Sequence, residues 1–305
     1  MFYAYNLCMQ DMSIQNPPNE LLEVAKVVEN ELDAQLALLQ LPDHLAGATT
    51  YAVVNGGKRV RPALTLLCCE AVGSSRQEAL AAAIAVEFVH CFSLVHDDLP
   101  AIDNDDLRRG KPTLHIHVGE AMALLAGDLL LPLAFSQLTN SKYPPEQQVK
   151  LTQLLAAATR DMVIGQVYDT LGGLPDGHEE NSFLEEIHRK KTGALIRCAC
   201  QMGAICGDAT DEAYDAIDAF GQATGLMFQI VDDLIDLHGS EGHVGKATGK
   251  DAQAGKKTYP GTIGVEASRM VVRELQDKAE SAIAVLGDTA ETLRSFNVWM
   301  AHRTR

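Results

Sequence analysis

The chain has 305 residues, of which 47% are hydrophobic and only 5% aromatic, and it carries a formal net charge of −16. This length permits one large domain, and a composition dominated by Ala and Leu favours helix over strand. The negative charge argues against nucleic acid or an anionic membrane surface as a partner. We therefore expect an all-α protein with one domain over residues 1–305, in which local cations or metal ions would hold any anionic substrate.

The cysteines indicate a reducing compartment. The seven of them form no Cys-x-x-Cys pair and mostly lie in apolar runs, which is typical of small buried side chains. The N-terminus lacks a basic region before an apolar one, and no uninterrupted apolar stretch reaches about 18 residues. We expect a cytoplasmic protein without a membrane span, in which residues 1–18 are a loosely ordered extension.

Helical patterns follow one another along the chain. Pro17 and Pro18 precede the first amphipathic run, Pro42 ends it, and later breaks fall at Gly and Pro pairs. Helices are predicted over residues 20–39, 44–54, 63–72, 76–98, 118–139, 145–171, 182–206, 209–238, 262–286 and 289–302. The polar segment 103–112 is expected to be a loop, and no alternating strand of useful length appears.

Two aspartate clusters carry most of the chemical information. Asp97-Asp98-Leu-Pro-Ala-Ile-Asp103 and Asp232-Asp233-Leu-Ile-Asp236 each end an apolar helical run. Asp232 and Asp236, four residues apart, share one helix face, where like charges raise each other's pKa unless a cation lies between them. Carboxylate oxygens suit Mg²⁺, which is usually shared with substrate phosphates. Acidic helix ends facing water are the simpler explanation, but two clusters that follow hydrophobic runs fit it poorly.

The first cluster also requires a local distortion. A straight helix would leave Asp97 and Asp103 on different faces. Because Pro100 prevents a regular turn, we expect a bulge that brings Asp103 back toward Asp97.

Basic clusters lie at the edges of several apolar helices. They are Gly56-Gly57-Lys58-Arg59-Val60-Arg61-Pro62, Arg108-Arg109-Gly110-Lys111, Lys190-Lys191-Thr192-Gly193, and the lysines of the segment after the second aspartate cluster. Helix N-termini favour phosphate, and Lys and Arg add charge and bidentate geometry. Together with the aspartates, they indicate a substrate with a diphosphate head and an apolar tail.

Five motifs in this order, GGKRVRP, HDDLPAIDNDDLRRGKPT, GQVYD, KTGAL and FQIVDDLID, closely resemble the trans-isoprenyl diphosphate synthases. The resemblance covers roughly residues 20–300. The four residues between the aspartates of the first cluster resemble the bacterial farnesyl diphosphate synthase subgroup. The resemblance implies an all-α bundle around a deep central cavity, usually a homodimer, with three Mg²⁺ ions per site for which Mn²⁺ could substitute.

The resemblance also assigns roles to residues. The implied Mg²⁺ ligands are Asp97, Asp103 and Asp232, with Asp98, Asp233 and Asp236 binding directly or through metal-bound water. The implied isopentenyl diphosphate ligands are Lys58, Arg61, His90 and Arg109. The implied allylic diphosphate ligands are Arg108, Lys191, Lys246 and Lys256, while Thr192 and Gln229 would face the developing carbocation.

The implied reaction is ionisation of the allylic C–O bond, attack by the isopentenyl double bond, and proton loss. In the resembling family, an aromatic residue five positions before the first aspartate accompanies the C15 product. Phe92 occupies this position beside the small Ser93, so farnesyl diphosphate is the expected product. A geranylgeranyl or geranyl diphosphate synthase is the alternative within the family.

Other residues have structural explanations. His96 is expected to pack or to lie one contact away from the metal, and His115 and His117 to face a loop surface. Gln166 and Asp169 lie in a motif that lines the cavity in the resembling family. For the tail residues Arg303 and Arg305, a frayed terminus is preferred over a cover for the site.

Three other functions remain as alternatives. A di-iron carboxylate protein could use the Glu-x-x-His pairs Glu87/His90 and Glu185/His188, but it leaves both aspartate clusters unexplained. An HD-type phosphohydrolase could use His90, His96 and Asp97, but it does not need the basic clusters. An inactive regulatory subunit of a prenyltransferase would typically lack one aspartate cluster, and both are intact here.

Overall fold

The computed structural model of the chain describes residues 16–173, 180–238 and 258–304, and these are almost entirely helical. The elements of the N-terminal half are α1 (Asn19–Ala37), α2 (Asp43–Val54), α3 (Val60–Ala71), η1 (Arg76–Ala79), α4 (Leu80–Asp97), β1 (Leu107–Arg108), β2 (Lys111–Pro112), α5 (Leu114–Val118), α6 (Glu120–Thr139) and α7 (Pro145–Leu171). The C-terminal half comprises α8 (Glu180–His188), η2 (Arg189–Gly193), α9 (Ala194–Cys206), α10 (Asp211–His238), α13 (Tyr259–Ile263), α14 (Val265–Ile283), η3 (Ala284–Ala290) and α15 (Glu291–His302). The predicted all-α class is confirmed.

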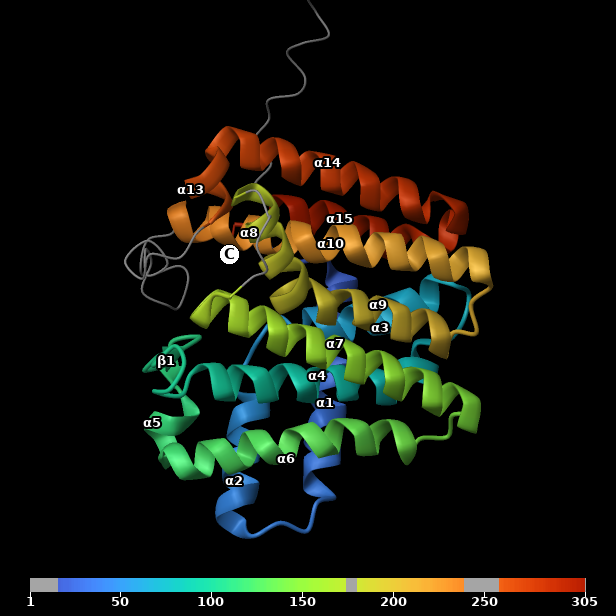
Figure 1. Cartoon of the computed structure of the whole chain (residues 1–305). Coiled ribbons are helices and arrows are strands. Elements are labelled where there is room, and N and C mark those ends of the chain that lie inside the picture. The colour runs from blue at the N-terminus through green and yellow to red at the C-terminus, as the bar shows by residue number, and fades with distance from the viewer. Residues whose placement is uncertain (1–15, 174–179, 239–257, 305) are drawn as a thin grey trace, which may run out of the picture.

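The long helices form a bundle in which α3, α4 and α9 are central and α6, α7, α10 and α14 surround them (Figure 1). Helix α4 is buried on almost every side, from Ala82 through Val89, which explains why its sequence is apolar all round. Helices α3 and α9 approach closely at Gly203, where an added Cβ would lie 2.2 Å from the carbonyl oxygen of Thr65. The core therefore fixes the ends of α4 and α10, which carry the aspartate clusters.

Helix α6, like α7, leaves part of its apolar surface uncovered. Leu125 is 55% exposed, Leu124 is exposed, and Ile116 of the adjoining α5 is exposed as well. By length and composition, α6 and the segment Arg76–Asp97 could each cross a membrane, but the latter is the buried centre of the bundle. Helices of this length and composition also form the cores of soluble proteins.

Several predicted boundaries shift, and two predicted elements have finer structure. Segment 103–112, expected to be a loop, contains a two-stranded antiparallel hairpin with Leu107 opposite Pro112. The helix predicted over 182–206 is interrupted by a turn of π-helix at Arg189–Gly193, called the π-turn below. π-Helical turns are rare and occur frequently at functional sites. This one lies in a basic cluster that the sequence had singled out.

Candidate active site

The first aspartate cluster has the predicted bulge. After α4 ends, the backbone N–H of Asp103 donates to the carbonyl oxygen of Asp97 at 2.9 Å, so the chain folds back on itself around Pro100. Burial raises the pKa of Asp97 to about 6; the nearby Lys191 opposes this shift and the Asp103 carboxylate adds to it. Two carboxylates held this close, one of them partly desolvated, are suited to binding a cation between them.

Asp98 has a different environment from Asp97. It is buried, and Nε and Nη2 of Arg108 donate to its carboxylate at 2.8 and 2.5 Å. Because Arg108 lies on strand β1, this pair ties the hairpin to the end of α4. In this arrangement Asp98 orients Arg108 through the Nε and Nη2 edge of its guanidinium.

In the second cluster, Asp233 is an anchor and Asp232 is partly open to solvent. The buried Asp233 accepts from Nε2 of Gln229 at 2.9 Å and from the backbone N–H of Tyr259 at 3.0 Å, which ties α10 to α13. The side chain of Asp232 remains 40% exposed. Asp236, one turn further along α10, is half-buried.

Arg303 closes onto this cluster from the C-terminal end of the described chain. Its side chain is only 2% exposed, and Nη2 donates to Asp232 Oδ1 at 2.6 Å and to the carbonyl oxygen of Phe228. The guanidinium also lies 4.6 Å from the centre of the Phe228 ring. The prediction of a frayed terminus is therefore wrong for Arg303, because the aromatic ring and the carboxylate provide it with a buried site. Arg305 lies outside the described residues.

The π-turn connects the two halves of the site. Nζ of Lys191 donates to Asp169 on α7 at 2.6 Å, so Asp169 of the GQVYD motif holds this lysine. The Thr192 hydroxyl donates to Oε1 of Gln229 at 2.8 Å, and Gln229 in turn reaches Asp233. Lys191 is also close enough to lower the pKa of Asp97. The structure thus brings the predicted residues of both clusters and of this turn into one region.

The three cations at the Gly-Gly loop before α3, Lys58, Arg59 and Arg61, have different environments. Arg59 adopts a left-handed conformation (φ 50°) and points inward, where Nη1 binds Glu87 at 2.6 Å and Nη2 binds the carbonyl oxygen of Val53. Arg59 is therefore a structural residue, which the sequence alone did not distinguish from its neighbours. Lys58 is exposed, whereas Arg61, the second residue of α3, contacts His90 on α4.

A cationic group surrounds His90. Arg61 Nη1 lies 3.4 Å from His90 Nε2, and Arg109 reaches across to the carbonyl oxygen of Gly56. Burial, reinforced by the charges of Arg61, Arg109 and Arg108, holds the pKa of His90 well below its usual value. The low pKa disfavours a charged imidazole at His90, so the positive charge beside it is carried by the neighbouring arginines.

The predicted chain-length residues lie on α4 below the first cluster. Phe92 is half-buried, and its ring meets His96 edge-on at a centroid distance of 4.8 Å. The Ser93 hydroxyl donates to the carbonyl oxygen of His90. His96 Nε2 lies 3.1 Å from the carbonyl oxygen of Leu124 on α6, which agrees with its predicted packing role.

Three further predictions have mixed outcomes. His115 is buried beside the Thr113 hydroxyl, so the expected surface position is wrong for it, whereas His117 is exposed and stacks on Tyr51. Gln166 bonds Thr170 through its amide nitrogen, and its buried Oε1 has no partner, as expected of a group that awaits a ligand or water. Lys246 and Lys256 lie outside the described residues.

The donor set suits Mg²⁺. Among the described residues, no three His, Cys, Asp or Glu side chains converge into a closed metal site. The carboxylates of Asp97 and Asp103 are nevertheless paired closely enough to disturb the pKa of Asp97, and Asp232 retains solvent access. All of these donors are hard oxygens, which suit Mg²⁺, an ion that usually shares its coordination with water and phosphate.

The same contacts weigh against the metal sites of two alternatives. Glu87 pairs with Arg59 through Oε1, and Glu185 pairs with Arg189, so in both Glu-x-x-His pairs the carboxylate is engaged by an arginine. His96 contacts α6 instead of joining Asp97, as an HD-type site would require.

An all-α bundle that combines two carboxylate clusters with a cationic loop defines a class of enzymes acting on diphosphates with apolar tails. Residues 42–292 match the Polyprenyl synthetase family, and the chain belongs to this family. The predicted recognition of the trans-isoprenyl diphosphate synthases is thereby confirmed, and the chain is a trans-prenyltransferase whose family uses prenyl diphosphates.

Curated relatives in Arabidopsis thaliana match over most of the chain. The chain is 43% identical to geranylgeranyl pyrophosphate synthase 11, chloroplastic, over 87% of its own length and 76% of that protein. It is 40% identical to geranylgeranyl pyrophosphate synthase 4, over 93% and 77%. Among solved structures, an FPP/GFPP synthase from Zymomonas mobilis has a TM-score of 0.81 at 35% identity, covering 93% of this chain and 98% of that chain.

Proposed function

We propose that this chain is a Mg²⁺-dependent geranylgeranyl diphosphate synthase, which extends an allylic diphosphate by head-to-tail condensation with isopentenyl diphosphate up to C20. The observation that supports the prenyltransferase activity is that the π-turn links both carboxylate clusters, since Lys191 lies close to Asp97 and Thr192 reaches Asp233 through Gln229. The C20 product is supported by identities of 40% and above to relatives named geranylgeranyl pyrophosphate synthases. We therefore prefer a C20 product to the C15 product expected from the sequence.

The second candidate is the farnesyl diphosphate synthase predicted from the sequence. Phe92 favours it, because a half-buried ring one and a half turns below Asp97 would block a growing tail. The Zymomonas mobilis FPP/GFPP synthase also supports products of more than one length on this fold.

The chain's own residues suggest how the reaction is assisted. Bound Mg²⁺ (or Mn²⁺ in its place) would neutralise charge on the departing diphosphate. Asp97, Asp103 and Asp232 would hold these ions, with Asp236 one turn beyond Asp232. Lys191, positioned by Asp169, would place a cation beside the same leaving group. Arg61, Lys58 and Arg109 would bind the isopentenyl diphosphate beside neutral His90.

Carbon–carbon bond formation needs a dry, polar-lined site. As the allylic C–O bond breaks, the isopentenyl double bond attacks the allylic carbon, and the resulting cation loses a proton, for which the departing diphosphate is the acceptor. The hydroxyl of Thr192 and the amide of Gln229 offer dipoles that could stabilise positive charge without reacting with it. The surrounding apolar helices would exclude water.

One experiment tests the reaction and the product together. The protein is incubated with Mg²⁺, isopentenyl diphosphate and dimethylallyl diphosphate, and the dephosphorylated products are sized by chromatography. We expect mainly C20, and no product in EDTA. A main C15 product would favour the second candidate, and absence of any prenyl product would reject the proposed activity.

We further propose that the enzyme is a cytoplasmic homodimer. The exposed apolar side chains Leu124 and Leu125 of α6 and Ile116 of α5 offer a contact surface, and the six described cysteines are free and buried, as suits a reducing compartment. Light scattering should show a dimer that Leu125→Asp converts to monomer, whereas Leu22→Asp on α1 should leave it intact. A monomeric wild type would reject this assembly.

A further inference from the structure

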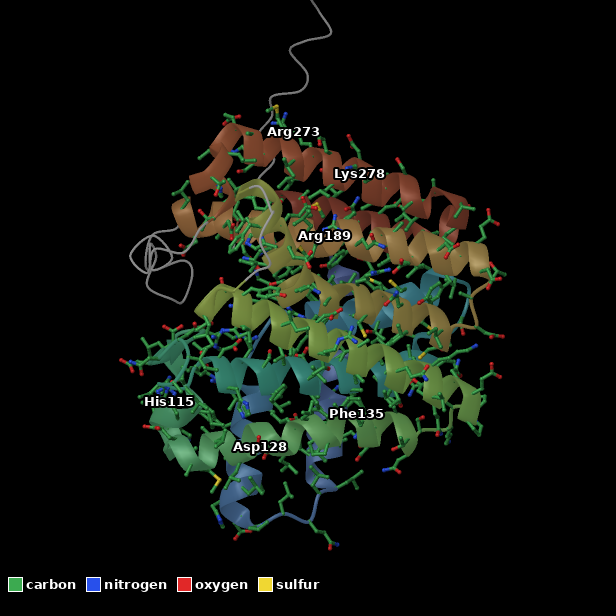
Figure 2. All side chains as sticks on the ribbon, in the orientation of Figure 1. His115, Asp128, Phe135, Arg189, Arg273 and Lys278 are labelled. Atoms are coloured by element: carbon green, nitrogen blue, oxygen red, sulfur yellow. The ribbon has the colours of Figure 1, made fainter. Side chains whose placement is uncertain are left out.

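The β1–β2 hairpin lies at one end of the bundle beside α5, whose His115 is labelled in Figure 2. Its two-residue turn consists of Arg109 and Gly110, which have positive φ angles of 55° and 75°. Such a turn matches the twist of the strands that it joins, but its first position usually carries Asn, Asp or Gly. An arginine there costs backbone strain, which indicates that its side chain is needed at this place.

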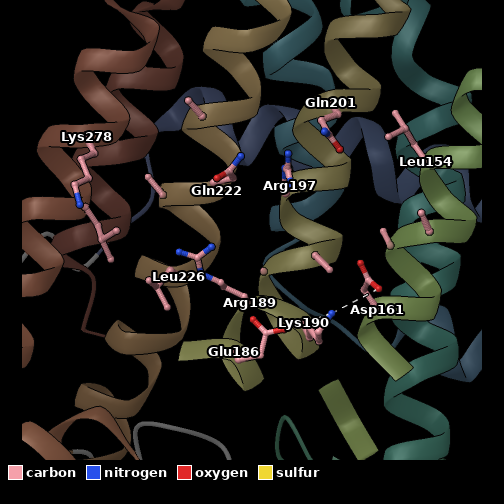
Figure 3. A pocket seen from close by; sticks show the side chains of 17 residues that line it. Leu154, Asp161, Glu186, Arg189, Lys190, Arg197, Gln201, Gln222, Leu226 and Lys278 are labelled. Carbon is pink, nitrogen blue, oxygen red and sulfur yellow. Dashed lines mark ion pairs between the residues drawn. The ribbon is translucent and has the colours of Figure 1, made fainter. Parts of the chain in front are cut away.

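The contact that holds Arg109 leaves its positive charge in place. In the groove between α7, α10 and α14 the arrangement is different, because Lys190 lies 3.8 Å from Asp161 and 3.5 Å from Glu186 (Figure 3), so that carboxylates compensate its charge. Arg109 donates instead to the backbone carbonyl oxygen of Gly56. A carbonyl oxygen orients a guanidinium without cancelling its charge, and an oriented guanidinium is suited to a phosphate.

The backbone of the Gly-Gly loop forms the seat of this guanidinium. A Cβ added to Gly57 would lie 2.6–2.8 Å from three atoms of the Arg109 guanidinium, so a side chain at this position would displace it. From this seat the charge of Arg109 contributes to the low pKa of His90. Arg109 therefore belongs to the cationic group around His90.

The two strands of the hairpin are attached to different helices. Strand β1 is held at the end of α4, where Arg108 donates to Asp98 at 2.8 and 2.5 Å. Strand β2 is held by α2, where the hydroxyl of Tyr51 donates to the carbonyl oxygen of Pro112 at 2.8 Å. The turn that carries Arg109 lies between these two attachments, so together they determine where its side chain begins.

Tyr51 and Gly56 belong to one structural unit, which is the last turn of α2 and the loop that follows it. The ring of Tyr51 stacks on the ring of His117 at a centroid distance of 4.2 Å and an interplanar angle of 15°, which limits the directions open to its hydroxyl. The same unit thus binds Pro112 of the hairpin and provides the acceptor for Arg109. A shift of the hairpin relative to α2 would move the guanidinium away from this acceptor.

We propose that Tyr51 is a positioning residue for isopentenyl diphosphate, because it holds the hairpin so that Arg109 stays beside Gly56 before the substrate binds. This inference rests on the proposed function, in which Arg109 binds that diphosphate. Without the Tyr51 hydroxyl, strand β2 loses its attachment to α2, and the substrate must order Arg109 at the expense of binding free energy. The allylic substrate is affected less, because Arg108 keeps its own attachment to Asp98.

Tyr51→Phe tests the proposal with little disturbance, because it keeps the ring and its stack on His117. Steady-state kinetics with each substrate varied in turn should show a KM for isopentenyl diphosphate raised about three- to tenfold, as expected for one lost neutral hydrogen bond. The allylic KM and kcat should stay within about twofold of wild type. Tyr143→Phe is the matched control, since its hydroxyl accepts from the backbone N–H of Ala82 near the start of α4. It should lower the melting temperature and leave both KM values unchanged.

A double-mutant cycle shows whether Tyr51 acts through Arg109. In an Arg109→Ala background, Tyr51→Phe should raise the KM for isopentenyl diphosphate by less than about twofold. Fully additive effects would overturn the proposal, as would an equal rise in both KM values, which indicates a structural role alone. An active wild type with an unchanged KM in Tyr51→Phe would also overturn it while leaving the proposed function intact. A wild type that forms no prenyl product would reject the proposed function and this inference with it.

Discussion

Asp232 and Arg303 are 71 residues apart in the chain, yet their side chains are 2.6 Å apart at the end of α10. The guanidinium of Arg303 is buried while the carboxylate of Asp232 is partly exposed. Oδ1 of Asp232 is therefore held by Arg303 on the protein side. This geometry makes Arg303 a positioning residue for the second aspartate cluster, and it leads to the first prediction.

Arg303→Ala should weaken binding of Mg²⁺ with pyrophosphate by about ten- to hundredfold, the equivalent of a lost charge-assisted hydrogen bond of roughly 1.5–3 kcal/mol. Arg303→Lys should be intermediate, because lysine keeps the charge but not the planar fork. The measurement is the thermal shift produced by Mg²⁺ and pyrophosphate. Arg294→Ala, which breaks the α15 ion pair with Glu280, serves as control. Unchanged or tighter metal binding in Arg303→Ala would contradict this role.

Asp97→Ala and Asp232→Ala should each remove nearly all turnover without unfolding the protein. Ionised Asp97 is unfavourable in the metal-free fold, since its pKa is raised to about 6, so Asp97→Ala should hold or increase metal-free stability at pH 7. This advantage should shrink as the pH falls below 6 and the wild-type carboxyl is protonated. Product assays and thermal melts check both points, and normal turnover in either variant would reject the carboxylate clamp.

Arg61→Ala and Lys58→Ala should mainly weaken isopentenyl diphosphate binding, by about ten- to hundredfold, with little effect on the allylic substrate. Arg59→Ala provides the contrast. It leaves the buried Glu87 unpaired and should cost roughly 3–5 kcal/mol of stability. Steady-state kinetics with each substrate varied in turn, together with denaturant melts, distinguish these effects. A larger loss for the allylic substrate would reverse the assignment of the two diphosphate sites.

Phe92→Ala should lengthen the product by at least one C5 unit, because the ring lies about one and a half turns below Asp97 on α4. It should also cost some stability, since the ring packs on the core and on His96. Sizing the dephosphorylated products of both proteins tests this. An unchanged product distribution from a folded variant would place the cavity floor on another helix.

His188 makes the fold sensitive to mild acid. Burial lowers its pKa to about 4, so between this value and the unfolded pKa near 6.5 the unfolded chain binds more protons than the native one. Stability that is present above pH 6.5 is therefore lost as the pH falls toward 4, by roughly 1.4 kcal/mol per unit. Denaturant melts should show a smaller loss in His188→Asn. Equal slopes would mean that His188 is protonated in the fold.

The sequence was sufficient for features encoded locally. Apolar spacing located the long helices, and Pro100 alone predicted the bulge that joins Asp103 to Asp97. The sequence was insufficient where contacts between distant residues determine the position of a side chain. Arg303 looks like a tail residue until Phe228 and Asp232 are folded against it. Arg59 and Arg61 are equivalent cations in the sequence, and only the left-handed backbone at Arg59 turns its side chain into the core.

The candidate site shows the same division. The residue types and their order were sufficient to predict two carboxylate clusters and a neighbouring cationic loop. The pairing of Asp98 with Arg108, and of Lys191 with Asp169, depends on the hairpin and on the π-turn. A Lys-Lys-Thr-Gly run is compatible with a regular helix, so periodicity could not reveal the π-turn.

The π-turn exposes the enzyme to one particular kind of genetic change. A π-helical turn contains one more residue than the α-helix would need, and each residue advances an α-helix by about 100°. Deleting a single codon between Arg189 and Gly193 would restore regular α-helical hydrogen bonds and give one continuous helix from α8 to α9. Because only Lys190, Lys191 and Thr192 lie between Arg189 and Gly193, the same deletion would remove one of these three side chains, so the chain would gain a more regular helix and lose the alignment of its active site.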